Sequence, residues 1–141
     1  MAEHFYYSIA SGSSGNCGLY VSDGTAVLID VGVSLRKLTA ALAAFDMKPG
    51  ELDALIITHE HIDHVKGLAM FLKKTEVPVF VSRGTAYFFR AYAHFELLCF
   101  FSDFSNDDAL GIPYVSHYHV VGNPPRDKVG ACYEQIMTDL T

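Results

Sequence analysis

Four side chains of the kinds that bind metal ions fall within one short stretch of this sequence, at His59, His61, Asp63 and His64. The stretch lies between an apolar run and a helical pattern. Alternate residues of an extended strand end point to the same side, so His59 and His61 are expected to bind one ion. Asp63 and His64 follow where the chain turns into a helix, and we expect them to face a neighbouring ion. The fold must therefore bring a strand end and a helix start together.

This cluster predicts hydrolytic chemistry. A divalent metal ion lowers the pKa of a bound water toward neutrality, and two neighbouring ions can hold a phosphate between its attacking and leaving oxygens. Three imidazoles and a carboxylate suit zinc best and manganese second. The alternative is a polar, solvated turn in which Asp63 caps the following helix. The density of ligand-type residues favours the metal centre.

Hydrophobic periodicity predicts a mixed arrangement of strands and helices. In the first two thirds we expect strands over 5–10, 17–22, 26–30, 52–58 and 77–82, with a hairpin turn at Asp23-Gly24. We expect helices over 35–45, capped by Ser34, over 65–74 and over 84–94. In the last third we expect strands over 96–101, 112–118 and 131–137. This order indicates an α+β fold in which helices cover sheets.

Length and composition limit the class of protein. At 141 residues, 50% hydrophobic and 18% charged, the chain is expected to form a single globular domain over 1–141. A net charge of −6 argues against a broad basic surface for nucleic acid, although bound divalent ions would make one cleft locally positive. Three cysteines without a C-x-x-C pair favour a reducing compartment. With no signal peptide and no long apolar run, we expect a cytoplasmic protein with no membrane segment.

Two motifs give the chain a family resemblance. The stretch from Thr58 to His64 resembles the central metal motif of the metallo-β-lactamase-fold hydrolases, and Leu28-Ile29-Asp30-Val31-Gly32 resembles their strand-end Asp-x-Gly motif. The loop from Ser11 to Cys17 is similar to that of the WalJ/YycJ-like branch. That branch contains bacterial cytosolic proteins associated with 5′-to-3′ exonuclease activity on DNA. The resemblance implies an αββα sandwich and a DNA or other phosphodiester substrate.

The resemblance also implies a ligand set. His59 and His61 would bind the first metal, and Asp63 and His64 the second, with Asp63 also acting in catalysis. His117 would be the third histidine of the first metal, with His119 as a rival; otherwise His117 is a core histidine. Asp139 would bridge both metals; otherwise it is an exposed carboxylate near a chain end.

The chain departs from the family at its end. Members of the family are longer and have two similar halves, whereas this sequence corresponds mainly to the N-terminal half, and no residue after Asp139 supplies the last metal histidine. Two divalent ions are expected, or only one if the second site is incomplete. The surface that the absent half would cover predicts self-association. Hydrolysis of another ester or thioester, or an inactive metal-binding fragment, are the alternative functions.

Other residues have two interpretations each. Asp30 either orients a ligand histidine or caps a turn. The loop 11–16 either offers N–H groups to a phosphate or is a plain tight turn. Lys66 either contacts a substrate phosphate or is a solvated lysine. Aromatic residues over 87–95 are expected in a core rather than stacked on bases, and Cys17 is expected to be buried.

Overall fold

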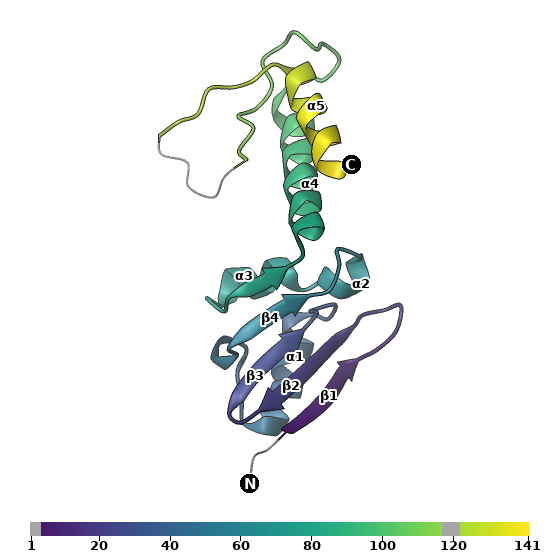
Figure 1. Cartoon of the computed structure of the whole chain (residues 1–141), viewed down its shortest axis with the longest axis vertical. Helices are drawn as coiled ribbons and strands as arrows, with labels where there is room; N and C mark the ends of the chain where they lie inside the picture. The colour runs from purple at the N-terminus through teal and green to yellow at the C-terminus, as the bar shows by residue number, and fades with distance from the viewer. Residues whose placement is uncertain (1–3, 117–121) are drawn as a thin grey trace. The chain divides into compact units, whose positions relative to one another are not determined.

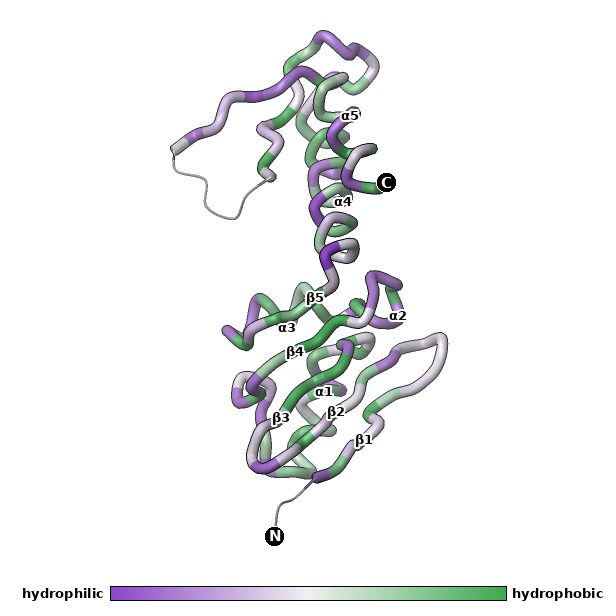
Figure 2. Tube along the Cα trace, viewed as in Figure 1, coloured by the Kyte–Doolittle hydropathy of each residue, from purple (hydrophilic) through white to green (hydrophobic). Residues whose placement is uncertain are grey.

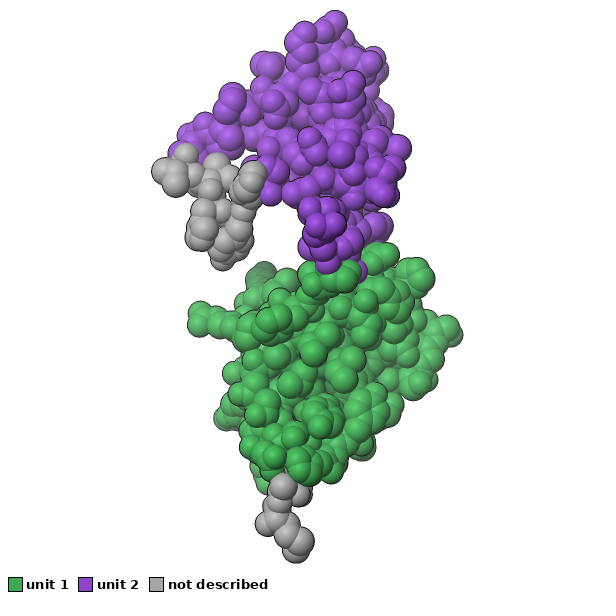
Figure 3. All heavy atoms as spheres, in the orientation of Figure 1, with its two compact units in different colours: residues 1–82 green, residues 83–141 purple. Residues whose placement is uncertain are grey.

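In a computed structural model of the chain, residues 4–116 and 122–141 are described. They form two compact units, unit 1 over Met1–Ser82 and unit 2 over Arg83–Thr141 (Figure 3). Each unit has its own cluster of buried apolar residues. Whether both belong to the single domain expected from the sequence stays a prediction. No helix among the described residues is long and apolar enough to cross a membrane.

Unit 1 is built on a five-stranded sheet with the strands in sequence order (Figure 1). The strands are β1 (His4–Ala10), β2 (Cys17–Ser22), β3 (Thr25–Ile29), β4 (Ala54–Ile57) and β5 (Val79–Val81). The first three pair antiparallel, and β3, β4 and β5 pair parallel. The predicted hairpin turn is confirmed: Asp23 and Gly24 both have positive φ, of 47° and 81°, as a two-residue turn between twisted strands requires.

Helices connect the parallel strands. They are α1 (Leu35–Leu42), the 3₁₀ turns Ala43–Phe45 and Pro49–Glu51, α2 (Ile62–Val65) and α3 (Leu68–Lys74). Ser34 caps α1 as predicted, since its hydroxyl accepts a hydrogen bond from the Lys37 backbone N–H at 3.3 Å. Leu38 of α1 and Phe71 of α3 are fully buried in one cluster with the apolar side chains of β2, β3 and β4. Figure 2 shows β3 and β4 as strongly hydrophobic strands, consistent with this central position.

The helix predicted over 65–74 is divided at Gly67. The backbone N–H of Gly67 donates to the carbonyl of Val31 at 2.8 Å. A Cβ on Gly67 would overlap the carbonyl oxygen of Val33, so only glycine allows this approach. The chain is thereby held against the segment that follows β3.

Gly32, in the segment that follows β3, also allows backbone segments to approach closely. A Cβ on Gly32 would overlap the carbonyl oxygen of Asp63 and crowd the backbone nitrogen of Asn16. These are backbone atoms, which cannot rotate away. The Asp-x-Gly motif therefore ends in glycine because three backbone segments meet there.

Substituting Gly32 by alanine is expected to lower the free energy of unfolding by about 2 kcal/mol, because forcing a methyl group into packed backbone costs this much. Gly50→Ala is the matched control, since a Cβ at Gly50 meets no atom within 4 Å. Urea titration followed by far-UV circular dichroism measures both. Equal stability of the two variants would contradict the close approach.

Unit 2 consists of two long helices, which corrects the sequence-based expectation for the last third. Helix α4 spans Arg83–Phe101, so the strand predicted over 96–101 is wrong, and helix α5 spans Val129–Leu140, so the strand predicted over 131–137 is wrong. The chain has no glycine or proline from Thr85 to Leu110, and nothing stops α4 where the prediction ended it. In α5, the buried Val129, Cys132 and Ile136 have helical spacing.

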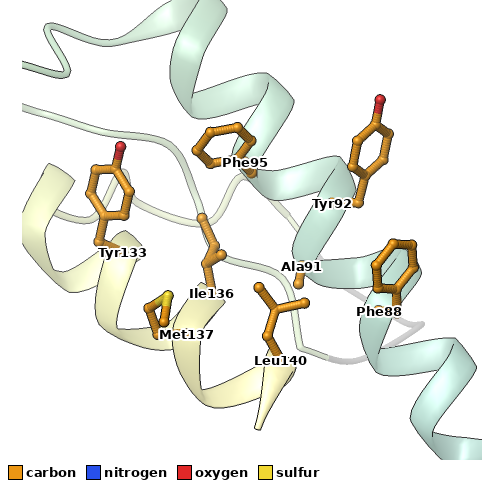
Figure 4. A pocket seen from close by; sticks show the side chains of 8 residues that line it. All are labelled: Phe88, Ala91, Tyr92, Phe95, Tyr133, Ile136, Met137 and Leu140. Carbon is orange, nitrogen blue, oxygen red and sulfur yellow. The ribbon is translucent and has the colours of Figure 1, made fainter.

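The remaining predicted strand, over 112–118, is also wrong in its described part. Residues 111–116 are irregular, and the nearest β-pairing is an isolated bridge between Leu110 and Lys128. Between α4 and α5 lies an apolar pocket of about 250 Å³, lined by side chains such as Phe88, Phe95 and Met137 (Figure 4). Several aromatic residues of 87–95 are partly exposed along α4, rather than buried as expected.

Candidate metal centre

Four of the predicted metal residues, His59, His61, Asp63 and His64, lie at the carboxyl edge of the parallel strands, where α/β sheets commonly bind ligands. Asp30 follows β3, the cluster from His59 to His64 follows β4, and the loop 11–16 enters β2 at the same edge. Backbone hydrogen bonds join these segments: Asn16 N–H donates to the Asp63 carbonyl at 2.7 Å, and Val31 N–H to the His64 carbonyl at 2.9 Å. Three separate parts of the sequence thus form one rigid frame.

The three histidines of the motif lie together. The ring centroids of His59 and His61 are 4.6 Å apart, and those of His59 and His64 are 3.9 Å apart. The expectation that His59 and His61 face the same side is therefore confirmed. Their backbone lies between the end of β4, at Ile57, and the start of α2, at Ile62.

Asp30 is the buried support of this cluster. It is 5% exposed and has a positive φ of 59°. Its carboxylate accepts hydrogen bonds from the Thr58 backbone N–H at 2.8 Å and the Thr58 hydroxyl at 2.8 Å, and from His64 Nδ1 at 2.7 Å. The carboxylate therefore orients His64, as one interpretation predicted, and also holds the backbone at Thr58; the ligand role of His64 stays a prediction.

These bonds determine which ring nitrogens remain open. An ionised carboxylate only accepts, so Nδ1 of His64 carries the proton and Nε2 keeps its lone pair. The Thr58 hydroxyl donates to Asp30 and lies 3.0 Å from His59 Nδ1, so it accepts the proton of that nitrogen. In the neutral rings of His59 and His64 the proton would then lie on Nδ1, and Nε2 would be the nitrogen offered to a metal.

The amide of Asn16 lies where a carboxylate oxygen of Asp63 and Nε2 of His64 come together. Its amide oxygen accepts from the Gly12 N–H at 3.0 Å, which fixes the orientation of the amide. Its Nδ2 donates to Asp63 Oδ2 at 2.8 Å and to His64 Nε2 at 3.1 Å. Sequence reasoning missed this side chain, which directly precedes β2 and is brought beside the end of β3 by the pairing of these two strands.

One pair of donor atoms has the spacing of two ligands on one divalent metal ion. Asp63 Oδ2 and His64 Nε2 are 3.6 Å apart. Two ligand atoms on a tetrahedral zinc lie about 3.4 Å apart for bonds of about 2.1 Å. Among the residues that the structure describes, no group of three or more His, Cys, Asp or Glu side chains is already placed to hold an ion. The fit therefore rests on the donor set and its supporting bonds.

Asp30→Asn is expected to weaken metal binding about 10- to 100-fold, the usual effect of removing a carboxylate that supports a ligand histidine. The matched control is Asp46→Asn, because Asp46 has nearly the same backbone conformation, with φ of 55°, and is exposed. Competition against a zinc indicator dye measures both affinities. Unchanged affinity in Asp30→Asn would contradict the support role.

Cys17 takes no part in the proposed ligand set. It is buried as expected. Burial, and in second place the charge of Asp30, raise the pKa of its thiol to about 12. The thiol stays protonated at neutral pH and is neither a thiolate ligand nor a nucleophile.

The other predicted ligands are not among these residues of unit 1. His117 and its rival His119 fall outside the described residues, so their roles stay predictions. Asp139 lies in unit 2, on α5 rather than at a strand end. It is a buried residue whose carboxylate forms an ion pair with Arg90, at 2.6 Å from Nε, and accepts the Tyr114 hydroxyl. The ligand role of Asp139 stays a prediction, and its observed partners are those of a structural ion pair.

Comparison with known proteins agrees with the motifs. A family model described as the metallo-beta-lactamase superfamily matches residues 10–132. The chain is 42% identical over 82 residues to exodeoxyribonuclease WalJ of Streptococcus pneumoniae, covering 57% of this chain and 30% of that protein. It is 36% identical over 86 residues to exodeoxyribonuclease YycJ of Bacillus anthracis, covering 60% and 32%.

A ribonuclease of Thermus thermophilus is 36% identical over 74 residues, covering 51% of this chain and 17% of that protein. The chain thus spans about a third or less of the length of these relatives. The resemblance to the WalJ/YycJ-like branch and the α+β fold class are confirmed. The chain belongs to the metallo-beta-lactamase superfamily, a family of hydrolases that generally bind divalent metal ions.

Proposed function

We propose that this chain hydrolyses phosphodiester bonds of DNA with a divalent metal, in the manner of a 5′-to-3′ exonuclease. The observation that carries the proposal is the convergence of Asp63 Oδ2 and His64 Nε2 on one point, the Asn16 amide, beside the rings of His59 and His61. The similarity to WalJ and YycJ supports the choice of DNA.

Different residues of the chain have different roles in the proposed reaction. When bound, a divalent metal supplies a water that ionises near neutral pH and neutralises charge on the phosphate. His59 and His61 would hold the first ion, and Asp63 and His64 the second, with zinc our first choice and manganese our second. Thr58 and Asp30 would orient the His59 and His64 rings through Nδ1, so that each ring would offer Nε2 to an ion. Asp63 is the residue that we place closest to the reacting phosphate.

The test is hydrolysis of linear duplex DNA carrying a label at either the 5′ or the 3′ end, with zinc or manganese added. A 5′-to-3′ exonuclease releases the 5′ label first as a short product and leaves closed circular DNA intact. Turnover of a simple ester or thioester without DNA cleavage would instead support the alternative hydrolase. Metal binding with no turnover on any of these substrates would support an inactive metal-binding fragment.

We also propose that copies of the chain associate through the outer face of the sheet. Tyr6, Tyr20, Ile56 and Phe80 lie on this face and are between 42% and 61% exposed. Sedimentation velocity is expected to show self-association that an Ile56→Ser/Phe80→Ser variant loses. A monomeric wild type at all concentrations would contradict it.

All three cysteines are free thiols, which supports a cytoplasmic location.

A further inference from the structure

A small pocket lies directly beside the candidate metal centre. Its volume is about 180 Å³, and it is lined by Ser13, Ser14, Ile62, Asp63 and Lys66. This volume is below the roughly 300–1,000 Å³ of pockets that hold drug-sized ligands, so it suits one small group. Asp63 belongs both to this lining and to the predicted ligand set. The pocket and the metal centre are therefore continuous.

The two walls of the pocket are fixed to each other. Ser13 and Ser14 are the central residues of a tight turn, which the Gly15 N–H closes by donating to the Gly12 carbonyl at 3.0 Å. The Asn16 amide holds this turn through Gly12 and also bonds Asp63 at 2.8 Å. The amide that marks the point of convergence in the metal centre thus also positions the two serines.

The donors of the pocket match a phosphate. Ser13, Ser14 and Lys66 are exposed, and their side chains form no ion pair or side-chain hydrogen bond with any residue that the structure describes. Two hydroxyls and an ammonium group are common partners of phosphate oxygens in nucleic-acid complexes. A lysine left unpaired in a chain of net charge −6 is available to an anionic ligand. The sequence left open whether Lys66 contacts phosphate; the pocket favours that contact.

We propose that Ser13, Ser14 and Lys66 bind a phosphate of the nucleic-acid substrate next to the one that is cleaved. This inference rests on the proposed function. The flanking phosphate fixes the strand so that the scissile phosphate lies at the metal centre. The Asp63 carboxylate would repel a phosphate in the same pocket, and a divalent ion bound at Asp63 removes that repulsion. Binding in the pocket is therefore expected to require metal.

The probe is a short, fluorescein-labelled single-stranded DNA with phosphorothioate linkages that resist hydrolysis, and fluorescence anisotropy gives its affinity. Lys66→Ala is expected to weaken binding about tenfold, as loss of a hydrogen bond to a charged group does. The slope of log affinity against log salt is expected to fall in magnitude by about 0.7, the value for one phosphate contact on a single strand. Ser13→Ala/Ser14→Ala is expected to weaken binding without changing that slope.

Controls separate this inference from the proposed function. Lys73→Ala removes an exposed lysine of α3, which does not line this pocket, and is expected to bind DNA as the wild type does. Metal content must be the same in all variants. If the wild type binds and cleaves DNA while Lys66→Ala and the serine variant bind equally well, the pocket assignment alone is overturned. A wild type that neither binds nor cleaves DNA overturns the proposed function, and the assignment with it.

Discussion

Substituting Asp63 by asparagine is expected to reduce phosphodiester hydrolysis about 1,000-fold, because metal-based stabilisation of the transition state contributes several kcal/mol. The fold is expected to survive. Asparagine keeps the shape of Asp63, and its amide oxygen can still accept the hydrogen bond that Asn16 Nδ2 now donates at 2.8 Å. What the substitution removes is the negative charge that would hold the second ion. Rates on labelled linear DNA, measured at saturating metal, give the effect.

Glu76→Gln is the matched control for this experiment. Glu76 is an exposed carboxylate of unit 1 that lies between α3 and β5, outside the metal frame. Its substitution removes one negative charge and is expected to leave both the rate and the melting temperature unchanged. A wild-type rate in Asp63→Asn would show that Asp63 is neither a ligand nor a catalytic residue. A large fall in melting temperature would instead show that the carboxylate is structural.

Substituting Arg90 by alanine is expected to destabilise unit 2 by about 3 kcal/mol, the lower end of the range for breaking a buried ion pair. The side chain of Asp139 is 3% exposed and that of Arg90 is 23% exposed, so the substitution leaves a buried carboxylate without its cation. Hydrogen exchange of the α5 amides, read by mass spectrometry, reports the local opening. The control is Arg83→Ala, at an exposed arginine of the same helix as Arg90. It is expected to change the free energy of local opening by less than about 0.5 kcal/mol.

The Arg90 prediction has a distinct pH dependence. The hydrogen bond from Arg90 is the main cause that holds the pKa of Asp139 below its usual range. The stability from this pair is therefore fully present above the pKa of an unfolded aspartate, about 3.9, and is lost as pH falls through the lower folded pKa. In Arg90→Ala the buried carboxylate is instead relieved by protonation. The gap between wild type and variant should shrink below about pH 4, and a constant gap would contradict the ion pair.

The clustering of His59, His61, Asp63 and His64 was predictable from the sequence because these residues are nearly contiguous. The strand period placed His59 and His61 on one side, and the structure confirms it. Asn16 was not predictable in the same way, because it reaches Asp63 across 47 residues of sequence. Only the pairing of Gly18 with Ile29, which sets the start of β2 beside the end of β3, brings it there. Periodicity within one segment carries no information about that pairing.

The last third was less predictable for a different reason. Helix α5 buries Asp139 on the same face as Cys132 and Ile136, so a charged residue interrupts the apolar pattern that would reveal the helix. The partner that makes this burial possible, Arg90, lies 49 residues earlier on α4. A prediction that assigns polar residues to the surface cannot recognise a buried ion pair. The strand predicted over 131–137 placed Asp139 just after a strand end for the same reason.

The most direct test of a metal centre built on His59, His61, Asp63 and His64 is the metal content per chain. The protein is purified without chelator, supplied with zinc or manganese, and compared with His61→Ala and with His4→Ala, a control at an exposed histidine of β1. We predict bound metal in the wild type and in His4→Ala, and a sharp loss in His61→Ala. Two ions per chain would indicate that both sites are complete, and one ion that only the first site is complete. No bound metal in the wild type after either addition would contradict the metal centre and the hydrolysis proposed to depend on it.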